Sequence, residues 1–429
     1  MIASYLPIIH PTVLCLAFVA ALLASLACKY WLSNRQVRHV AQHRHAVPPM
    51  FAATVPLSAH QKAADYTLSR SRFGLLSLAF NTALLLGWTL LGGLDALNKL
   101  LLDSLQAEFG SMAYQLALLL AFTVIGALLD LPWELYNTFS LEQRFGFNRI
   151  TWRLYLADGL KGAFVAALIG LPIAALMLWL MGSAGAYWWL WAWGAWVAFN
   201  LLILVLYPTV IAPLFNKFEP LPDDGLKQRV EGLMTRCGFA AKGLFVMDGS
   251  RRSAHGNAYF TGFGPAKRVV FFDTLLARLN GPEVEAVLAH ELGHFKHRHV
   301  LKRMMMLFAF SLAGFALLGW LTQQIGFYLA FSVQPNMSAP NDALALLLFL
   351  LVLPVFSFFL TPLASRLSRR DEFQADAYAC AQASSTDLAS ALLKLHEDNA
   401  GTLTPDPVYA RFYYSHPPAS ERLAALQAH

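Results

Sequence analysis

Seven long apolar stretches constrain the fold of this chain more than any other feature. They lie near residues 6–28, 73–95, 113–133, 162–182, 187–210, 304–326 and 342–364. About 20 residues of helix cross the roughly 30 Å of hydrocarbon in a bilayer, so each stretch is long enough to span a membrane. Of all 429 residues, 57% are hydrophobic and 14% are charged, whereas soluble chains carry about 25% charged residues. The sequence therefore predicts a mainly α, polytopic membrane protein with about seven transmembrane helices.

Positively charged side chains are distributed unevenly between these stretches. Seven Lys or Arg residues lie between 29 and 72 and three between 137 and 159, but the 96–112 segment contains only Lys99. None lies between 304 and 365. Because Lys and Arg accumulate on the cytosolic side, the pattern predicts an N-terminus outside and a C-terminus in the cytosol. No positive charge precedes the first stretch, which we interpret as a retained span rather than a secretory signal.

The predicted spans divide the chain into four parts. Residues 1–210 form an N-terminal transmembrane region with five spans, and 304–365 hold two more. The segments 211–303 and 366–429 carry most of the remaining polar sequence and are both expected in the cytosol. In the first of them we predict a small α/β unit with a helix at 226–237, strands at 244–247 and 269–272, an edge strand or turn at 257–264, and a helix that begins at Pro282 and Glu283.

Composition argues against two other kinds of binding site. The net charge of +6 is better explained by topology and by contacts with anionic headgroups than by nucleic acid, because the basic residues gather beside apolar stretches. The cysteines have no paired spacing, so neither a disulfide framework nor a thiolate zinc site is predicted. They are Cys15, Cys28, Cys237 and Cys380.

The strongest chemical signal is His-Glu-Leu-Gly-His at residues 290–294. Two histidines four apart lie on the same face of a helix, about 6 Å apart along its axis, and can reach one tetrahedral zinc ion. Glu291 follows the first histidine and can take a proton from an attacking water molecule. The five-residue pattern also occurs by chance, so the rest of the sequence must support it.

A third ligand has to come from another part of the chain. His297 lies about 10.5 Å along the helix from His290, too far to share a metal with it. We interpret His297 and His299 as a solvated helix face. Glu372, directly after the last span, is the best candidate. Asp376 lies on the same face and can accept the N–H of a ligand histidine. We expect Arg369, Arg370 and Asp371 to be a solvated charge cluster.

Several long motifs resemble those of the membrane CAAX prenyl protease family of zinc peptidases, the Ste24 type. The likeness covers nearly the whole chain. Besides HELGH, the matching stretches are LPWELYNTFSLEQRFGFNRIT at 131–151, YPTVIAPLFNKFEPL at 207–221, HGNAYFTGFG at 255–264, SRRDEFQAD at 368–376 and YSHPPASERLAAL at 414–426.

The resemblance implies roles for individual residues. The metal ligands would be His290, His294 and Glu372, holding one Zn²⁺ per chain. Glu291 would be the general base and Asp376 a supporting carboxylate. It also implies that the segment Asn257, Ala258, Tyr259 and Phe260 is an edge strand that pairs with the substrate backbone, and that His416 and Arg422 line the cleft and stabilise the oxyanion.

The family resemblance further implies a cytosolic zincin-like metallopeptidase domain with a small sheet, closing a large chamber between the transmembrane helices. The implied substrates are polypeptides that are lipidated, membrane-associated or misfolded. Compact loops, and no retention signal after Gln427, favour a bacterial inner membrane.

Two alternative functions are less consistent with the sequence. A transporter or channel that binds zinc without peptidase activity needs repeated polar residues at mid-membrane, and the spans at 304–326 and 342–364 offer almost none. A site-2 type intramembrane protease carries HExxH inside a hydrophobic span. Here Lys302 and Arg303 separate the motif from the next apolar stretch, which predicts a metal site at or beyond the membrane surface.

Overall fold

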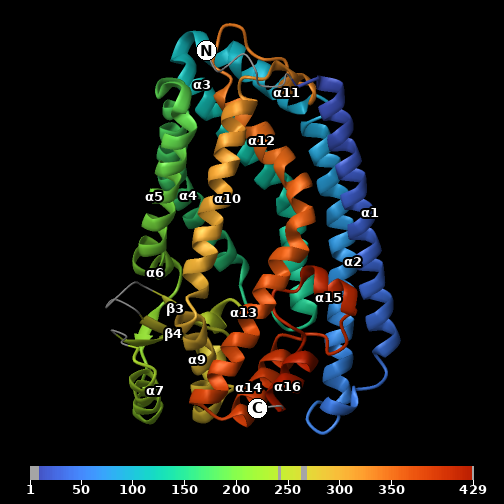
Figure 1. Ribbon diagram of the computed structural model, residues 1–429, viewed down its shortest axis with the longest axis vertical. Helices are drawn as coiled ribbons and strands as arrows, with labels where there is room; N and C mark the ends of the chain where they lie inside the picture. The colour runs from blue at the N-terminus through green and yellow to red at the C-terminus, as the bar shows by residue number, and fades with distance from the viewer. Residues whose placement is uncertain (1–8, 240–242, 262–267, 428–429) are drawn as a thin grey trace.

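Long helices run side by side along the longest axis of the molecule (Figure 1). The structure, a computed structural model, describes residues 9–239, 243–261 and 268–427. At one end of the long axis the helices meet a smaller unit that contains the sheet. The first helix of the chain starts near the opposite end from the last helix (Figure 1).

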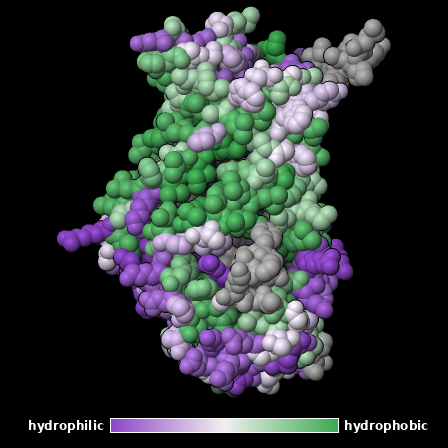
Figure 2. All heavy atoms as spheres, turned by 90° about the vertical axis from the view of Figure 1, so that its left-hand side faces the viewer, coloured by the Kyte–Doolittle hydropathy of each residue, from purple (hydrophilic) through white to green (hydrophobic). Residues whose placement is uncertain are grey.

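Six helices in the described ranges are long and apolar enough to cross a membrane. Residues 73–88 of the predicted span 73–95 lie in a further helix, α2 (Leu57–Trp88), which packs along the first helix and has a polar first half. The predicted span continues past the end of this helix at Trp88. Figure 2 shows a hydrophobic band between polar ends. The six helices that could cross a membrane are α1 (Pro11–His43), α3 (Gly93–Tyr136, extended as a π-helix to Glu142), α4 (Trp152–Ser183), α5 (Trp188–Leu206, extended to Phe215), α10 (His299–Leu321), and α12 (Asp342–Ser357) continued into α13 (Thr361–Gln382).

Two segments between the predicted spans are largely helical. Residues 96–112 belong to α3, where Leu94, Leu97 and Leu101 have helical spacing and pack into the core between the spans. The break in this helix comes at Gly110, whose φ of 81° suits glycine. Much of 29–72 is also helical, because α1 and α2 continue past their apolar parts. Hydropathy marks the part of a helix that fits the bilayer and not its ends.

The predicted α/β unit is present, with strands where the sequence placed them. The sheet has the order β1-β2-β4-β3. β2 pairs with β4 in parallel and β3 pairs with β4 antiparallel, so β3 is an edge strand of the described sheet. Residues 262–264 of the predicted edge segment lie outside the described residues. The strands are β1 (Phe218–Pro220), β2 (Leu244–Met247), β3 (Ala258–Thr261) and β4 (Arg268–Phe272).

Four shorter helices pack with the sheet and α13 into a second hydrophobic core. The central one, α9 (Gly281–Lys296), carries the HELGH motif and begins with a capping box. The Asn280 side chain accepts from the Glu283 amide, and the Glu283 carboxylate accepts from the Asn280 amide. The others are α7 (Asp224–Arg236), α14 (Ser385–Asp398) and α16 (Ala419–Gln427), and α15 (Pro407–Tyr413) packs against α13 and α1.

α9 and α13 approach each other closely at Gly293, inside the HELGH motif. A Cβ atom at Gly293 would lie 2.9 Å from the Cα and 3.0 Å from the carbonyl oxygen of Ala375. Both neighbours are backbone atoms, so no side-chain rotation could relieve the clash. The glycine is therefore what lets the two helices approach closely enough to share one site.

We predict that Gly293→Ala separates α9 from α13, lowers the melting temperature and weakens metal binding. Forcing a methyl group into a packed contact costs about 1–3 kcal/mol. Gly232→Ala in α7 is the matched control, because a Cβ there would lie 3.6 Å from its nearest neighbour, the end of the Arg236 side chain. That change should be neutral or stabilising by up to about 1 kcal/mol. A Gly293→Ala protein that melts like the wild type would contradict the prediction.

Candidate metal site

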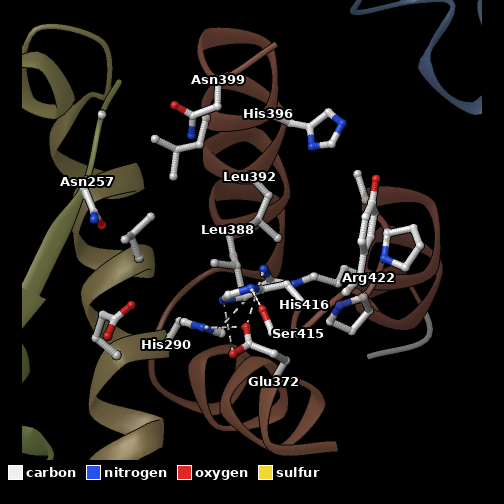
Figure 3. A pocket seen from close by; sticks show the side chains of 18 of the residues that line it. Asn257, His290, Glu372, Leu388, Leu392, His396, Asn399, Ser415, His416 and Arg422 are labelled. Atoms are coloured by element: carbon white, nitrogen blue, oxygen red, sulfur yellow. Dashed lines mark hydrogen bonds and ion pairs between the residues drawn. The ribbon is translucent and has the colours of Figure 1, made fainter. Parts of the chain in front are cut away.

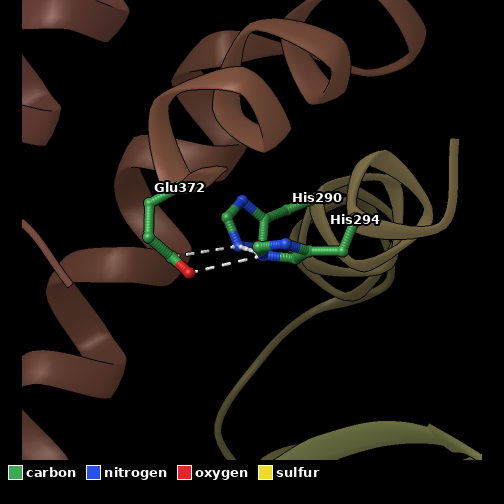
Figure 4. A group of neighbouring side chains, drawn as sticks. All are labelled: His290, His294 and Glu372. Atoms are coloured by element: carbon green, nitrogen blue, oxygen red, sulfur yellow. Dashed lines mark hydrogen bonds and ion pairs between the residues drawn. The ribbon is translucent and has the colours of Figure 1, made fainter. Parts of the chain in front are cut away.

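His290 and His294 on α9 meet Glu372 on α13 (Figure 4). One ligand atom from each lies within 4.8 Å of the others. The two Nε2 atoms are 3.2 Å apart. Glu372 Oε2 lies 3.5 Å from His290 Nε2, and Oε1 lies 3.4 Å from His294 Nε2. The helix brings the two histidines together because they are one turn apart.

The electrostatics of this group favour a positive charge at its centre. His290 Nδ1 lies 2.8 Å from Asp376 Oδ1, so this nitrogen donates to the carboxylate and Nε2 faces Glu372. Burial alone lowers the pKa of His290, but its interactions with the carboxylates of Asp376 and Glu372 outweigh burial and raise the pKa to about 9. Burial and the charge of His290 lower the pKa of His294 to about 4.

The same atoms suit a divalent metal ion. The buried Oε2 of Glu372 has no hydrogen-bond partner among the described residues. Two imidazole nitrogens and one carboxylate are a ligand set typical of catalytic zinc sites. The geometry therefore fits a bound metal.

Glu291 lines the cavity beside these three residues. Its burial raises the pKa of the carboxyl group above the ordinary glutamate value. A carboxylate with raised pKa is a stronger base, which is the property that proton transfer from water requires.

The cleft around the site has a volume of about 550 Å³. Figure 3 shows His290, Glu372 and His416 gathered at one end, with Leu388 and Leu392 projecting from α14 along the wall. This apolar wall was not predicted from the sequence. The amphipathic pattern of α14 indicates that one of its faces is buried, but not that part of it faces a cleft.

The predicted substrate strand is only partly directed at this cleft. Asn257 and Ala258 line it. Tyr259 lines a different cavity, with residues of β1 and β4. Phe260 packs into the core against Phe239. Side chains alternate along a strand, so four consecutive residues cannot all face the cleft.

His416 and Arg422 reach the site from the C-terminal segment. His416 lies between α15 and α16, with its Nε2 3.5 Å from Glu372 Oε1. Arg422 on α16 is buried and binds Asp376 through Nε at 2.8 Å and Nη2 at 2.5 Å. Its Nη1 lies 3.8 Å from Glu372 Oε2. Arg422 thus balances the charge of the carboxylate that orients His290.

Three residues predicted to be solvated are part of the structure around the site. His299 is 1% exposed and touches His294. Arg369 donates to the carbonyl oxygens of two residues in and after α15. Asp371 binds Arg303 of α10. The prediction was wrong for these residues because it judged each by its charged neighbours in sequence. In the fold, α13 directs Arg369 and Asp371 toward other elements, and the start of α10 places His299 against His294. Arg370 is exposed as expected.

Comparison with known proteins identifies the family. Residues 36–217 match the CAAX prenyl protease N-terminal model, described as five membrane helices, and residues 220–429 match peptidase family M48. The CAAX prenyl protease 1 homolog of Homo sapiens is 34% identical over 96% of this chain and 95% of its own length. The chain belongs to the Ste24 type of peptidase family M48.

A further relative and a solved structure support the same family assignment. CAAX prenyl protease 1 of Saccharomyces cerevisiae is 31% identical over 94% of this chain and 93% of its own. A crystal structure of S. mikatae Ste24p is 30% identical, covers 96% of this chain and 98% of its own, and has a TM-score of 0.88.

Membership in this family confirms several of the predictions made from the sequence. The chain is a polytopic membrane protein and a metallopeptidase that acts on polypeptides. The comparisons give no support to a transporter or channel. The four-part division of the chain stays a prediction, because the two family models meet near residue 218. The chamber between the helices also stays a prediction.

We predict that Arg369 holds the His416 turn in place. Its Nη1 donates to Ala410 O at 3.2 Å and to Tyr414 O at 2.7 Å. Arg369→Met removes both bonds, so peptidase turnover should fall roughly tenfold, about 1.4 kcal/mol, while metal content is unchanged. Arg370→Met, one position further on, is the control and should behave like the wild type. Equal activity of the two variants would show that the turn does not need Arg369.

Proposed function

We propose that this chain is a zinc metalloendopeptidase that cleaves lipidated or membrane-associated polypeptides at the cytosolic face of a membrane. The observation that carries the proposal is the convergence of His290, His294 and Glu372 in a cleft that also contains Glu291. This is the ligand set and the base that metal-assisted peptide hydrolysis requires.

In the proposed reaction, His290, His294 and Glu372 hold one zinc ion. When bound, zinc supplies a Lewis acid that polarises the carbonyl of the scissile peptide bond. Glu291 takes a proton from the attacking water and passes it to the leaving amine. Asp376 keeps the Nδ1 proton of His290 in place, so that Nε2 remains available.

The remaining site residues bind and orient the peptide. We place the substrate backbone along the free edge of β3, beside Asn257 and Ala258, as an added strand. Tyr259 and Phe260 contribute to this edge through their backbone. His416 and Arg422 stabilise the negative charge that develops on the carbonyl oxygen.

Two observations support the proposed substrate class. A relative from Arabidopsis thaliana, 38% identical over 70% of this chain, carries the name CAAX prenyl protease 1 homolog. The cleft here has an apolar wall at Leu388 and Leu392. Both suit a short peptide segment with aliphatic side chains that is attached to the membrane. We also propose, from the compact loops, that the protein lies in a bacterial inner membrane.

The test compares a farnesylated CaaX peptide with its unprenylated twin, using purified wild type and Glu291→Gln. Gln keeps the size of Glu291 but cannot act as a base near neutral pH. The variant should keep its zinc and its melting temperature and lose on the order of 10²–10⁴-fold in turnover. A zinc chelator should abolish wild-type cleavage.

The outcomes separate the parts of the proposal. Near-normal cleavage by Glu291→Gln would show that another group activates the water. Full wild-type activity after zinc removal would exclude a zinc peptidase. Equal cleavage of both peptides would show that the lipid is not recognised.

The proposed orientation gives a separate prediction. A reporter fused after residue 429 should be cytosolic and one fused before the first span should be outside, because the basic segments follow the positive-inside rule. Protease protection of the two tags measures this. Finding both tags on one side would require an even number of spans.

A further inference from the structure

We propose that His299 positions His294 by accepting its Nδ1 proton, which fixes the tautomer in which His294 offers Nε2 to the metal. The inference rests on the proposed role of His294 as a ligand. His299 touches no substrate or metal in this arrangement, so it is a positioning residue and not a catalytic one.

The contact between the two rings is short and shielded from water. His294 Nδ1 and His299 Nδ1 are 2.9 Å apart, and His299 is 1% exposed. Two ring nitrogens at this distance form a hydrogen bond only when one of them carries a proton and the other a lone pair. The question is which ring is the donor.

The surroundings of His299 answer it. Its other nitrogen, Nε2, faces two acceptors on α13: Gln374 Oε1 at 3.0 Å and Asp371 Oδ1 at 3.5 Å. The ring proton of neutral His299 therefore lies on Nε2, and Nδ1 has the lone pair. His294 must then donate from Nδ1, which leaves its Nε2 as a lone pair.

That lone pair is aimed at the site. His294 Nε2 lies 3.2 Å from His290 Nε2 and 3.4 Å from Glu372 Oε1 (Figure 4). Residues of α13 thus orient both His290 and His294. Asp376 fixes His290 directly, whereas Gln374 and Asp371 fix His294 through His299.

An unusual backbone conformation makes the contact possible. Arg298 lies in the left-handed region, with φ 55° and ψ 34°, between the end of α9 and the start of α10. For a residue other than glycine this conformation is strained and persists only where the surroundings require it. The turn folds His299, the first residue of a membrane-spanning helix, back onto a ligand of the helix before it.

The experiment measures zinc affinity on the full-length protein in detergent. Metal-free wild type, His299→Phe and His299→Asn are titrated with Zn²⁺ against a competing chromogenic chelator. Phe keeps most of the ring volume but has no acceptor. Asn places an oxygen where Nδ1 was. His297→Phe is the control, because His297 lies two residues away and stacks on His299, with no hydrogen bond to a ligand among the described contacts.

We expect His299→Phe to weaken zinc binding about 10–100-fold, the usual effect of removing a partner that orients a ligand. His299→Asn should stay within about threefold of the wild type by keeping an acceptor, and His297→Phe should match the wild type. The metal-free melting temperatures should remain close together. Gln374→Leu should cost less than His299→Phe, and nothing further when the two are combined.

Two results would overturn the inference. Zinc affinity of His299→Phe equal to that of the wild type would show that His294 needs no acceptor. Equal losses in His299→Phe and His299→Asn would show that the ring matters only for packing. If wild type itself lacks tight zinc binding, the proposed metal site fails first and this inference falls with it, a result that the wild-type titration identifies alone.

Discussion

The close contact of α9 with α13 at Gly293 and Ala375 is the constraint on which the site depends. The two proposed ligand histidines lie on α9, and Glu372 and Asp376 lie on α13. Neither helix could supply a complete metal site alone, because side chains of one helix diverge from its axis. Each helix also connects to membrane spans, α9 to α10 and α13 to α12. The packing of two helices therefore places the chemistry at the end of the transmembrane bundle.

Charge balance explains why this buried site needs a cation. The carboxylates of Glu291, Glu372 and Asp376 face one guanidinium, that of Arg422. Buried charges are costly unless they are paired, and Arg422 is largely engaged by Asp376. The remaining negative charge accounts for the raised pKa of His290. A proton on His290 is the positive charge that the protein itself can supply. A divalent metal ion can take the place of that proton.

Local sequence patterns predicted the parts of this arrangement that local geometry determines. The spacing of His290 and His294, and that of Glu372 and Asp376, follows from helix periodicity alone, and both pairs lie as expected. His299 could not be assigned in this way. Its contact depends on the break at Arg298, and nothing in the residue type of an arginine predicts a left-handed conformation. The apolar wall of α14 and the hydrogen bonds of Arg369 depend on tertiary packing between distant segments.

The position of the site on α13 bears on the kind of substrate it can reach. Leu363 is an exposed apolar residue near the end of the predicted membrane part, and Glu372 lies nine residues further along the same helix. Nine residues of helix rise about 14 Å, which an extended chain covers with about four or five residues. A polypeptide held in the bilayer, by a lipid or by a helix of its own, would therefore need only a short free segment to reach the cleft. Along β3, backbone hydrogen bonds would bind such a segment without requiring a particular sequence, so membrane attachment itself could supply much of the selectivity.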